Sequence, residues 1–398
     1  MTHSSSVDGS SSPRSEEPFR PVLFDLSSPA ERTALHDLRA SGRVRDVHDR
    51  IESQLGELVS CLSPGSQLVG AELEAAISRA TDGVSSEAYG TWVWYPWSGR
   101  LVHVLPRDEY RLVRTDRNRG KITRSQQRSL LTRSIGVIGL SVGAAAAMAC
   151  AAEGVGGTFL LADLDQLSLS NLNRLRAGVD QLGIDKTVLC ARAMAELDPY
   201  LEVEIYRDGL DEASLSAFVD RCPDLLIEEC DTPWAKVAVR EMARAQRVPV
   251  LMEANDRGLL DIERFDLEPH RPLFHGRIGA TTARDVRQLD QAGLTAFMLQ
   301  AIGAERLSPE MAEALPEIGR TLSSWPQLAS GVLLGGALVT DSARRILLGE
   351  HVMSGSYGVD LNALIPAQDI DRTGTEPTGA GLCEAPVSHQ PVAVEAAR

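Results

Sequence analysis

Six polar residues between positions 163 and 231 have types and an order that could serve one reaction: Asp163, Asp165, Asn171, Arg174, Lys186 and Asp231. When a carboxylate attacks the α-phosphate of ATP and pyrophosphate leaves, negative charge grows on oxygens that are already anionic. Arg174 can offer a planar fork of donors, Lys186 a point charge, and Asp231 the hard oxygen ligand that Mg²⁺ prefers. Singly, such residues could end strands or lie solvated on the surface, but the ordered set favours one shared site.

A glycine-containing segment precedes these residues and is the element that could place a phosphate beside them. Residues 134–143 read Ser-Ile-Gly-Val-Ile-Gly-Leu-Ser-Val-Gly, and an alanine-rich run and a second apolar run ending at Asp163 follow. This order predicts a strand, a glycine turn, a helix and a second strand. Gly139 and Gly143 would let the backbone approach a phosphate at the helix N-terminus. Ser141 could donate its hydroxyl to that phosphate or act as a small turn residue.

Five short apolar runs indicate the sheet that carries the site: 135–139, 158–163, 203–207, 224–228 and 248–253. Runs of this kind, separated by helical patterns, are typical of a parallel sheet covered by helices on both faces. Ligands bind at the carboxyl ends of such strands, where Asp163 and Asp231 fall. Asn255, Asp256 and Arg257 also follow a strand, either as substrate-side residues or as a polar loop.

The order of these motifs resembles the adenylyltransferase domain of the ubiquitin-activating-enzyme superfamily, in its bacterial ThiF/MoeB/HesA branch. The resemblance extends over roughly residues 110–270 and more loosely over 320–365. It implies an α/β, Rossmann-like fold with a mainly parallel sheet. It also implies roles in ATP binding: Asp163 for the ribose, Asn171, Arg174 and Lys186 for the triphosphate, Asp231 for Mg²⁺, and Gly139, Ser141, Gly143 and Asp165 for the rest of the nucleotide site.

Two departures from the family pattern affect these expectations. The family loop is Gly-x-Gly-Gly-x-Gly, whereas the segment 139–143 is shorter. The Cys-x-x-Cys pairs that hold zinc in many relatives are absent from the sequence, so no zinc is expected; its cysteines are dispersed, at Cys61, Cys150, Cys190, Cys222, Cys230 and Cys383. Cys230 abuts Asp231, and whether it forms a thioester stays open; we expect adenylation without an obligatory thioester.

A basic segment at residues 111–122 matches the place where an arginine of the family reaches into the partner subunit's ATP site. The resemblance makes Arg119 the candidate for this role and Arg117 the second choice. The alternative is a basic linker with solvated side chains. If Arg119 crosses between subunits, the enzyme should be a symmetric homodimer.

Composition and patterning divide the chain into four parts. We expect a disordered N-terminus at 1–18, a small α+β N-terminal domain at 19–110, the ThiF-type domain at 111–367 and a flexible tail at 368–398. Helices are predicted at 30–38, 44–62 and 331–349, and strands at 91–98, 100–106 and 356–361. The flanking regions resemble a subgroup in which such a domain is fused to a nitroreductase-like flavoprotein, although this chain has no flavin domain.

The net charge of −15 over 398 residues argues against a nucleic-acid partner, which needs a basic surface. The polar first residues contain no signal-peptide core, and glycines interrupt the most apolar stretch. These features predict no membrane association and a cytoplasmic location with reduced thiols.

The sequence therefore predicts an ATP- and Mg²⁺-dependent adenylyltransferase that activates a carboxylate as its acyl-AMP for a nitrogen or sulfur nucleophile. The carboxylate could belong to a small molecule, to a peptide or to a ubiquitin-like carrier protein, and we favour a small molecule or peptide in specialised biosynthesis. The alternatives are sulfur-carrier activation as in thiamin or molybdopterin pathways, an NAD-binding oxidoreductase, and an inactive scaffold subunit. The sequence identifies neither the acid nor the acyl acceptor.

Overall fold

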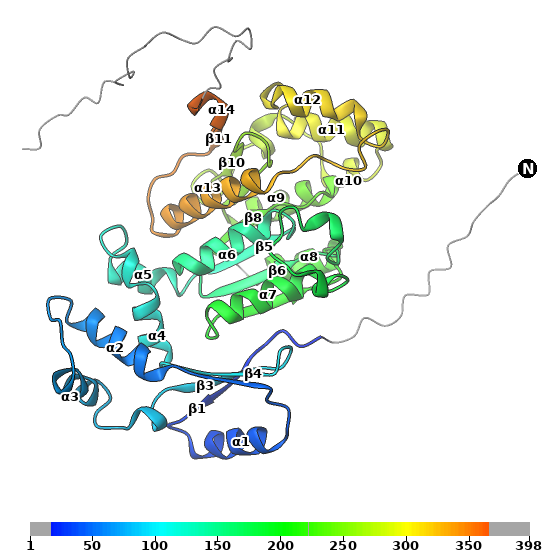
Figure 1. Cartoon of the computed structure of the whole chain (residues 1–398). Coiled ribbons are helices and arrows are strands. Elements are labelled where there is room, and N and C mark those ends of the chain that lie inside the picture. The colour runs from blue at the N-terminus through cyan, green and yellow to red at the C-terminus, as the bar shows by residue number, and fades with distance from the viewer. Residues whose placement is uncertain (1–16, 222, 366–398) are drawn as a thin grey trace, which may run out of the picture. The chain divides into compact units, whose positions relative to one another are not determined.

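The computed structural model describes residues 17–221 and 223–365 (Figure 1). The described residues up to Val359 belong to one compact unit, and a second unit begins at Asp360. The described part of the second unit holds only the short helix α14 (Leu361–Leu364). The tail predicted at 368–398 and residues 1–16 of the predicted disordered N-terminus lie outside the described residues.

A seven-stranded sheet forms the centre of the first unit, in the order β11-β10-β9-β8-β5-β6-β7. Its strands are β5 (Ser134–Ile138), β6 (Thr158–Ala162), β7 (Glu202–Tyr206), β8 (Leu225–Glu228), β9 (Val250–Glu253), β10 (Leu260–Glu263) and β11 (Gly355–Tyr357). The five strands from β9 to β7 are parallel, and β10 and β11 extend the sheet antiparallel. The α/β fold with a mainly parallel sheet is confirmed, with each predicted parallel strand placed within two residues of its observed ends.

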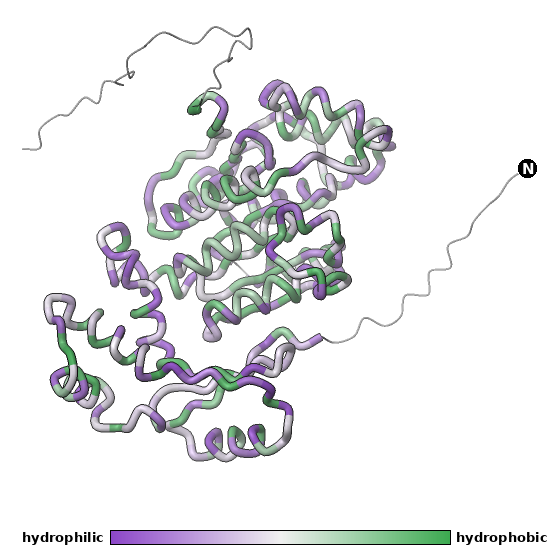
Figure 2. The backbone as a smooth tube through the Cα atoms, in the orientation of Figure 1, coloured by the Kyte–Doolittle hydropathy of each residue, from purple (hydrophilic) through white to green (hydrophobic). Residues whose placement is uncertain are grey.

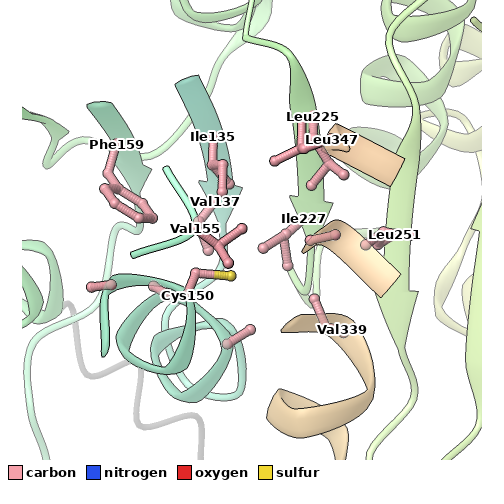
Figure 3. Packing of buried hydrophobic residues seen from close by; sticks show 14 of the residues in the cluster. Ile135, Val137, Cys150, Val155, Phe159, Leu225, Ile227, Leu251, Val339 and Leu347 are labelled. Carbon is pink, nitrogen blue, oxygen red and sulfur yellow. The ribbon is translucent and has the colours of Figure 1, made fainter. Parts of the chain in front are cut away.

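Alternate residues of the central strands enter two apolar cores on opposite faces of this sheet. Ile135 and Val137 pack with α6 (Gly143–Glu153), α7 (Lys186–Leu197) and α13 (Ala329–Leu347). The other face packs against α8 (Glu212–Val219) and α9 (Pro233–Gln246). Burial on both faces explains why the strands are continuous apolar runs. Figure 3 shows the first core, and Figure 2 shows hydrophobic residues gathered along the central strands and helices.

Other helices of the first unit lie before and after these strands in the chain. Two of them, α4 (Arg107–Arg114) and α5 (Arg124–Leu130), precede β5. Three others, α10 (Ala283–Val286), α11 (Gln291–Ile302) and α12 (Pro309–Ala314), lie in the chain between β10 and α13. In the parts of the chain that the structure describes, no helix combines the length and apolar character needed to cross a bilayer.

A second, four-stranded sheet occupies the N-terminal part of the unit, in the order β1-β3-β4-β2. Its strands are β1 (Val22–Asp25), β2 (Asp46–Asp49), β3 (Thr91–Tyr95) and β4 (Arg100–Val104), accompanied by α1 (Pro29–Ala40), α2 (Ile51–Leu62) and α3 (Ala71–Ala80). The helix predicted at 44–62 is wrong in its first part, because β2 pairs there with β4 and α2 begins only at Ile51. The strand predicted at 356–361 ends early, at Tyr357.

The N-terminal sheet packs against the end of α7 that is farther from the predicted site. The hydroxyl of Tyr95 in β3 donates to the Ala195 carbonyl at 3.2 Å, and beside the sheet the hydroxyl of Tyr110 in α4 donates to the Leu197 carbonyl at 2.7 Å. Since α7 begins at Lys186 and rises about 1.5 Å per residue, these contacts lie roughly 13–17 Å along the helix from that lysine. The N-terminal sheet therefore supports α7 rather than contributing side chains to the site.

Candidate functional site

A pocket of about 200 Å³ opens where β5, β6 and β8 end. It is lined by six of the predicted site residues: Gly139, Ser141, Asp163, Asp165, Lys186 and Asp231. The chain runs from β5 to β6 on one side and reaches β8 on the other, so the pocket lies at the point where the strand order reverses. Open α/β sheets bind their ligands at such points.

Gly139 is required by the geometry of the glycine turn. Its φ is +88°, and a Cβ there would lie 2.5 Å from the carbonyl oxygen of Glu229. Any side chain would therefore combine a strained backbone with a clash against the end of β8. After this turn α6 begins at Gly143, with no side-chain cap on its first turn. Its N-terminal N–H groups are thus suited to an anion, although the loop is shorter than the family pattern.

Asp163 and Asp165 hold the loop and Lys186 together. The Asp163 carboxylate accepts the Leu140 N–H at 2.6 Å and the Asp165 N–H at 2.8 Å. Lys186 Nζ lies 2.7 Å from Asp165 Oδ2 and 3.9 Å from Asp163 Oδ1. Burial raises the pKa of Asp163, against the opposing effect of the Lys186 charge. The two acids therefore keep the buried lysine positioned at the wall of the pocket.

Arg174 approaches the same pocket through Ser141. Its Nε and Nη2 donate to the Ser141 hydroxyl oxygen at 3.1 and 3.0 Å. The serine is thus an acceptor for the arginine in this structure, a contact between residues 33 positions apart that neither reading of Ser141 anticipated. Burial lowers the pKa of Arg174, and the nearby Asp231 charge opposes that effect. The exposed Asp231 therefore lies within electrostatic range of the guanidinium.

Two predicted site residues, Asn171 and Arg119, do not line the pocket and contact residues that are near them in the sequence. Asn171 Oδ1 accepts the N–H and the hydroxyl of Ser168, at 3.1 and 3.0 Å, and so fixes the turn that leads to Arg174. Arg119 is 44% exposed at its side chain, pairs with Asp116 at 3.2 Å and does not line the pocket of its own chain.

Sequence reasoning missed a fully buried charge network behind the pocket. Glu228 Oε1 lies 3.0 Å from Lys236 Nζ, and Glu228 Oε2 lies 2.5 Å from Arg240 Nη1; Arg240 Nε also reaches Glu263 at 2.5 Å. Although burial raises the pKa of Glu228, the two cations bring it down to about 2. The signal in the sequence was a pair of acids, Glu228 and Glu229, directly after an apolar strand.

Cys230 lines the pocket, but its environment disfavours the thiolate. Burial and the Glu228 charge raise the pKa of this thiol well above its ordinary value. Because the thiolate is the nucleophilic form of cysteine, Cys230 is poorly suited to form a thioester in this state.

Comparison with known proteins finds a family to which the residues around the pocket are similar. Residues 115–304 match the model of the ThiF family. The chain is 44% identical over 278 residues to Uncharacterized protein MT1398 of Mycobacterium tuberculosis, and the match covers 70% of this chain but only 39% of that protein. It is 26% identical over 179 residues to the molybdopterin-synthase adenylyltransferase of Haemophilus influenzae, covering 44% of this chain and 72% of the relative.

Among solved structures, the tRNA N6-threonylcarbamoyladenosine dehydratase TcdA of E. coli superimposes with a TM-score of 0.44 at 17% identity. That match covers 62% of this chain and 98% of the dehydratase chain. The family match includes the glycine turn and every pocket residue named above, from Gly139 to Asp231. Residues 115–304 are thus similar to the ThiF family, over a segment that includes the glycine turn and the pocket.

Proposed function

We propose that the pocket binds ATP with Mg²⁺ and that the protein activates a carboxylate as its acyl-AMP. The observation that carries this proposal is that Lys186 and Asp231 line one pocket at a glycine turn, with Arg174 held against the pocket residue Ser141. Two cations and a carboxylate at such a turn suit a metal-bound triphosphate better than the pyrophosphate of NAD. The relative named as an adenylyltransferase supports the transfer of an adenylyl group.

Each pocket residue has a definite task in this reaction. In this proposal the N–H groups at the start of α6 bind phosphate oxygens, and Asp163, which holds the loop through the Leu140 N–H, contacts the ribose. Lys186 and Arg174 exchange their contacts with Asp165 and Ser141 for contacts with the triphosphate. Asp231 offers an exposed hard-oxygen ligand that fits Mg²⁺, which when bound would neutralise charge on the phosphates.

The proposed chemistry is an in-line displacement. A carboxylate oxygen forms a bond to the α-phosphorus, the bond to the bridging oxygen breaks, and pyrophosphate leaves with the electron pair. Lys186 and Arg174 stabilise the charge that builds on the phosphate oxygens. A nitrogen or sulfur nucleophile then attacks the acyl carbon, and AMP leaves.

Substitution of the cationic and acidic pocket residues tests the assignment. Arg174→Ala and Asp231→Ala should abolish carboxylate-dependent exchange of labelled pyrophosphate into ATP while leaving thermal unfolding unchanged. Arg128→Ala, at an exposed arginine of α5, is the matched control and should keep full exchange. Full exchange in Arg174→Ala would remove the site assignment.

The same measurements separate two other functions. An oxidoreductase would be stabilised against heat by NAD rather than by ATP. An inactive scaffold would bind ATP but exchange no pyrophosphate with any acid. We favour the enzyme over the oxidoreductase because Lys186, Arg174 and Asp231 would have no task in NAD binding; pyrophosphate exchange decides between the enzyme and the scaffold.

We propose a small molecule or a peptide as the acid, within specialised biosynthesis. Activation of a sulfur-carrier protein is the second candidate, supported by the molybdopterin-synthase relative. Carboxylate-dependent release of pyrophosphate, measured over small acids, peptides and carrier proteins, decides between them. Turnover with a carrier protein alone would overturn our choice.

We further propose a homodimer in which Arg119 reaches the partner's pocket. Its exposed side chain is held only by Asp116 on its own chain among the described residues. Arg119→Ala and Asp231→Ala chains, each inactive alone, should then recover about a quarter of the wild-type exchange when they are mixed after partial denaturation. About half of the dimers would be mixed, and one of the two sites in each would combine an intact Asp231 with the partner's intact Arg119. A monomer in sedimentation, or no recovery on mixing, would contradict this arrangement.

The domain boundaries and the subgroup are also proposals. We assign residues 19–110 and 111–367 to separate domains; two unfolding transitions in calorimetry would support this division, and a single transition would contradict it. The fusion subgroup is supported by the greater length of the M. tuberculosis relative, which leaves room in that protein for a flavin domain. A flavin absorption band in that purified relative would support the subgroup, and its absence would contradict it.

A further inference from the structure

A second polar cluster lies behind the pocket, on the face of the sheet that α6 and α13 cover. It consists of Glu229, which follows β8, Glu253 at the end of β9, and Asn255 two residues later. Glu229 lines the pocket, and its Oε1 accepts the Glu253 N–H at 2.8 Å. The cluster is therefore continuous with the proposed ATP site.

Glu253 and Asn255 are buried without the partners that such groups require. Glu253 is 3% exposed and Asn255 9% exposed. Within residues 17–221 and 223–365, neither carboxyl oxygen of Glu253 and neither amide atom of Asn255 has a hydrogen-bond partner. Folded proteins rarely bury polar side chains in this way, because each loses its water without replacement.

The helix α13, which covers the cluster, has glycines at the two positions that face these side chains. A Cβ at Gly335 of α13 would overlap the Glu253 carboxyl, and one at Gly331 would lie 3.0 Å from Asn255 Oδ1. Asn255 itself adopts a φ of +51°, a conformation that is uncommon outside glycine. The glycines of α13 and the left-handed backbone at Asn255 thus let these two polar side chains lie directly against the helix, beside the pocket residue Glu229.

The chemistry of the cluster selects a ligand that donates hydrogen bonds. The carboxyl oxygens of Glu229 and Glu253 and the amide oxygen of Asn255 can accept hydrogen bonds, and the two carboxyls, once ionised, would repel a phosphate or a carboxylate. No group of three or more His, Cys, Asp or Glu side chains in the described chain is arranged to hold a metal ion. A primary ammonium group carries one positive charge and three N–H donors, which match these acceptors.

The acidity of Glu253 agrees with this reading. Burial and the Asp256 charge raise its pKa to about 8, against the opposing effect of the Asn255 backbone N–H, which lies outside hydrogen-bonding geometry. A cation bound here would take the place of the proton that this carboxyl otherwise keeps.

We propose that Glu253 and Asn255 form a subsite for a primary ammonium group carried by one of the two organic reactants, either the acid that is activated or the amine that captures it. The proposal rests on the proposed adenylation for the identity of the reactants. The ammonium binding itself is a separate property of the folded chain, so the two can fail independently.

Thermal unfolding of the full chain tests the subsite without turnover. Methylammonium chloride should raise the Tm of the wild type by about 1–3 °C over tetramethylammonium chloride at matched ionic strength, because the second cation has no N–H group. Glu253→Gln keeps the shape of the side chain but cannot become an anion, so it should lose this increment. Asn255→Gly keeps the left-handed backbone and should reduce it. Glu72→Gln, at an exposed acid of α3, should behave as wild type.

Equal increments in the wild type and in Glu253→Gln, or none in the wild type, would overturn the subsite. If Glu253→Gln folds poorly, the methylammonium-induced rise in Tm is compared between the wild type and Asn255→Gly, and an equal rise in both would overturn the subsite.

Pyrophosphate exchange then identifies the reactant that carries the ammonium group. Exchange with amino acids but not with their N-acetyl derivatives places the group on the acid. Exchange with simple acids, followed by AMP release that accelerates with added primary amine, places it on the acceptor. In either case Glu253→Gln should raise the half-saturating concentration of the amino compound about tenfold or more, as expected for one lost charge-assisted contact. An unchanged value would count against the subsite even where exchange itself is normal, whereas absence of all exchange with a preserved methylammonium increment would overturn only the proposed function.

Discussion

Glu228 and Glu229 are neighbours at the end of one strand, yet they enter opposite faces of the sheet and meet opposite surroundings. Glu228 faces α9 and contacts Lys236 and Arg240, so that two cations satisfy it inside the protein. Glu229 faces α6 and α13, where its neighbour Glu253 is an acid without a hydrogen-bond partner among the described residues. The first acid is part of the scaffold, whereas the second adjoins Glu253, a buried acid whose hydrogen-bonding capacity is left for a ligand.

This difference shows how to separate structure from function among buried charges. A buried acid paired with cations is costly to disrupt but offers nothing to a ligand, whereas an unpaired one lowers stability and retains binding capacity. We therefore expect substitutions at the two clusters to have effects of opposite sign on stability.

The largest effect on stability should come from the paired cluster, which consists of Glu228, Lys236, Arg240 and Glu263. Arg240→Met would leave Glu228 and Glu263 buried beside one cation fewer and should lower the free energy of unfolding by about 3–5 kcal/mol, as measured by urea denaturation. Arg284→Met, at an exposed arginine of α10, is the control and should change it by less than about 0.5 kcal/mol. A small effect at Arg240 would mean that the paired cluster is not a structural element.

The unpaired cluster, which consists of Glu229, Glu253 and Asn255, should have an intermediate effect on stability, and this effect should depend on pH. Because the pKa of Glu253 is raised to about 8 in the folded protein, the folded state retains a proton that the unfolded state has lost above its ordinary pKa of 4.5. Stability should therefore fall as pH rises, by up to about 2.5 kcal/mol between about pH 5 and pH 7. Two other acids, Glu229 and Asp256, lie close enough to interact with the Glu253 carboxyl through their charges.

Glu253→Gln should remove that pH dependence, as seen in the difference between urea denaturation curves of the variant and the wild type. Parallel pH profiles for the two proteins would show that Glu253 titrates normally.

The smallest effect should appear at the helix that covers the unpaired cluster. Gly335→Ala gains helix propensity but forces Cβ against the Glu253 carboxyl, so the variant should lose about 1–2 kcal/mol of stability overall. In a Glu253→Ala background the same change should stabilise the protein, by up to about 1 kcal/mol. Additive effects in this double-mutant cycle would disprove the contact between the helix and the acid.

The sequence predicted the parts of the fold that depend on local pattern. Strands buried on both faces must be continuous apolar runs, and Gly139 must be glycine at a tight turn, so both were visible in one sequence. The exposed strand β2 carries no such pattern, and its residues were therefore assigned to a helix.

The site was predictable as a set of residue types but not as a set of contacts. The pairing of Arg174 with Ser141 depends on how two distant loops meet. The cluster of Glu229, Glu253 and Asn255 depends on strand order and on which face each residue takes, and the glycines of α13 that make room for it lie about 80 positions later. These features required the three-dimensional structure.

The central claim is that an oxygen of a carboxylate attacks the α-phosphate of ATP in the pocket between Gly139 and Asp231. It is tested most directly by supplying an accepted acid whose carboxylate is labelled with heavy oxygen and analysing the nucleotide product by mass spectrometry. The account predicts AMP that carries one labelled oxygen, with equimolar unlabelled pyrophosphate, in the wild type but not in Asp231→Ala. Unlabelled AMP, or ADP with labelled phosphate, would contradict it.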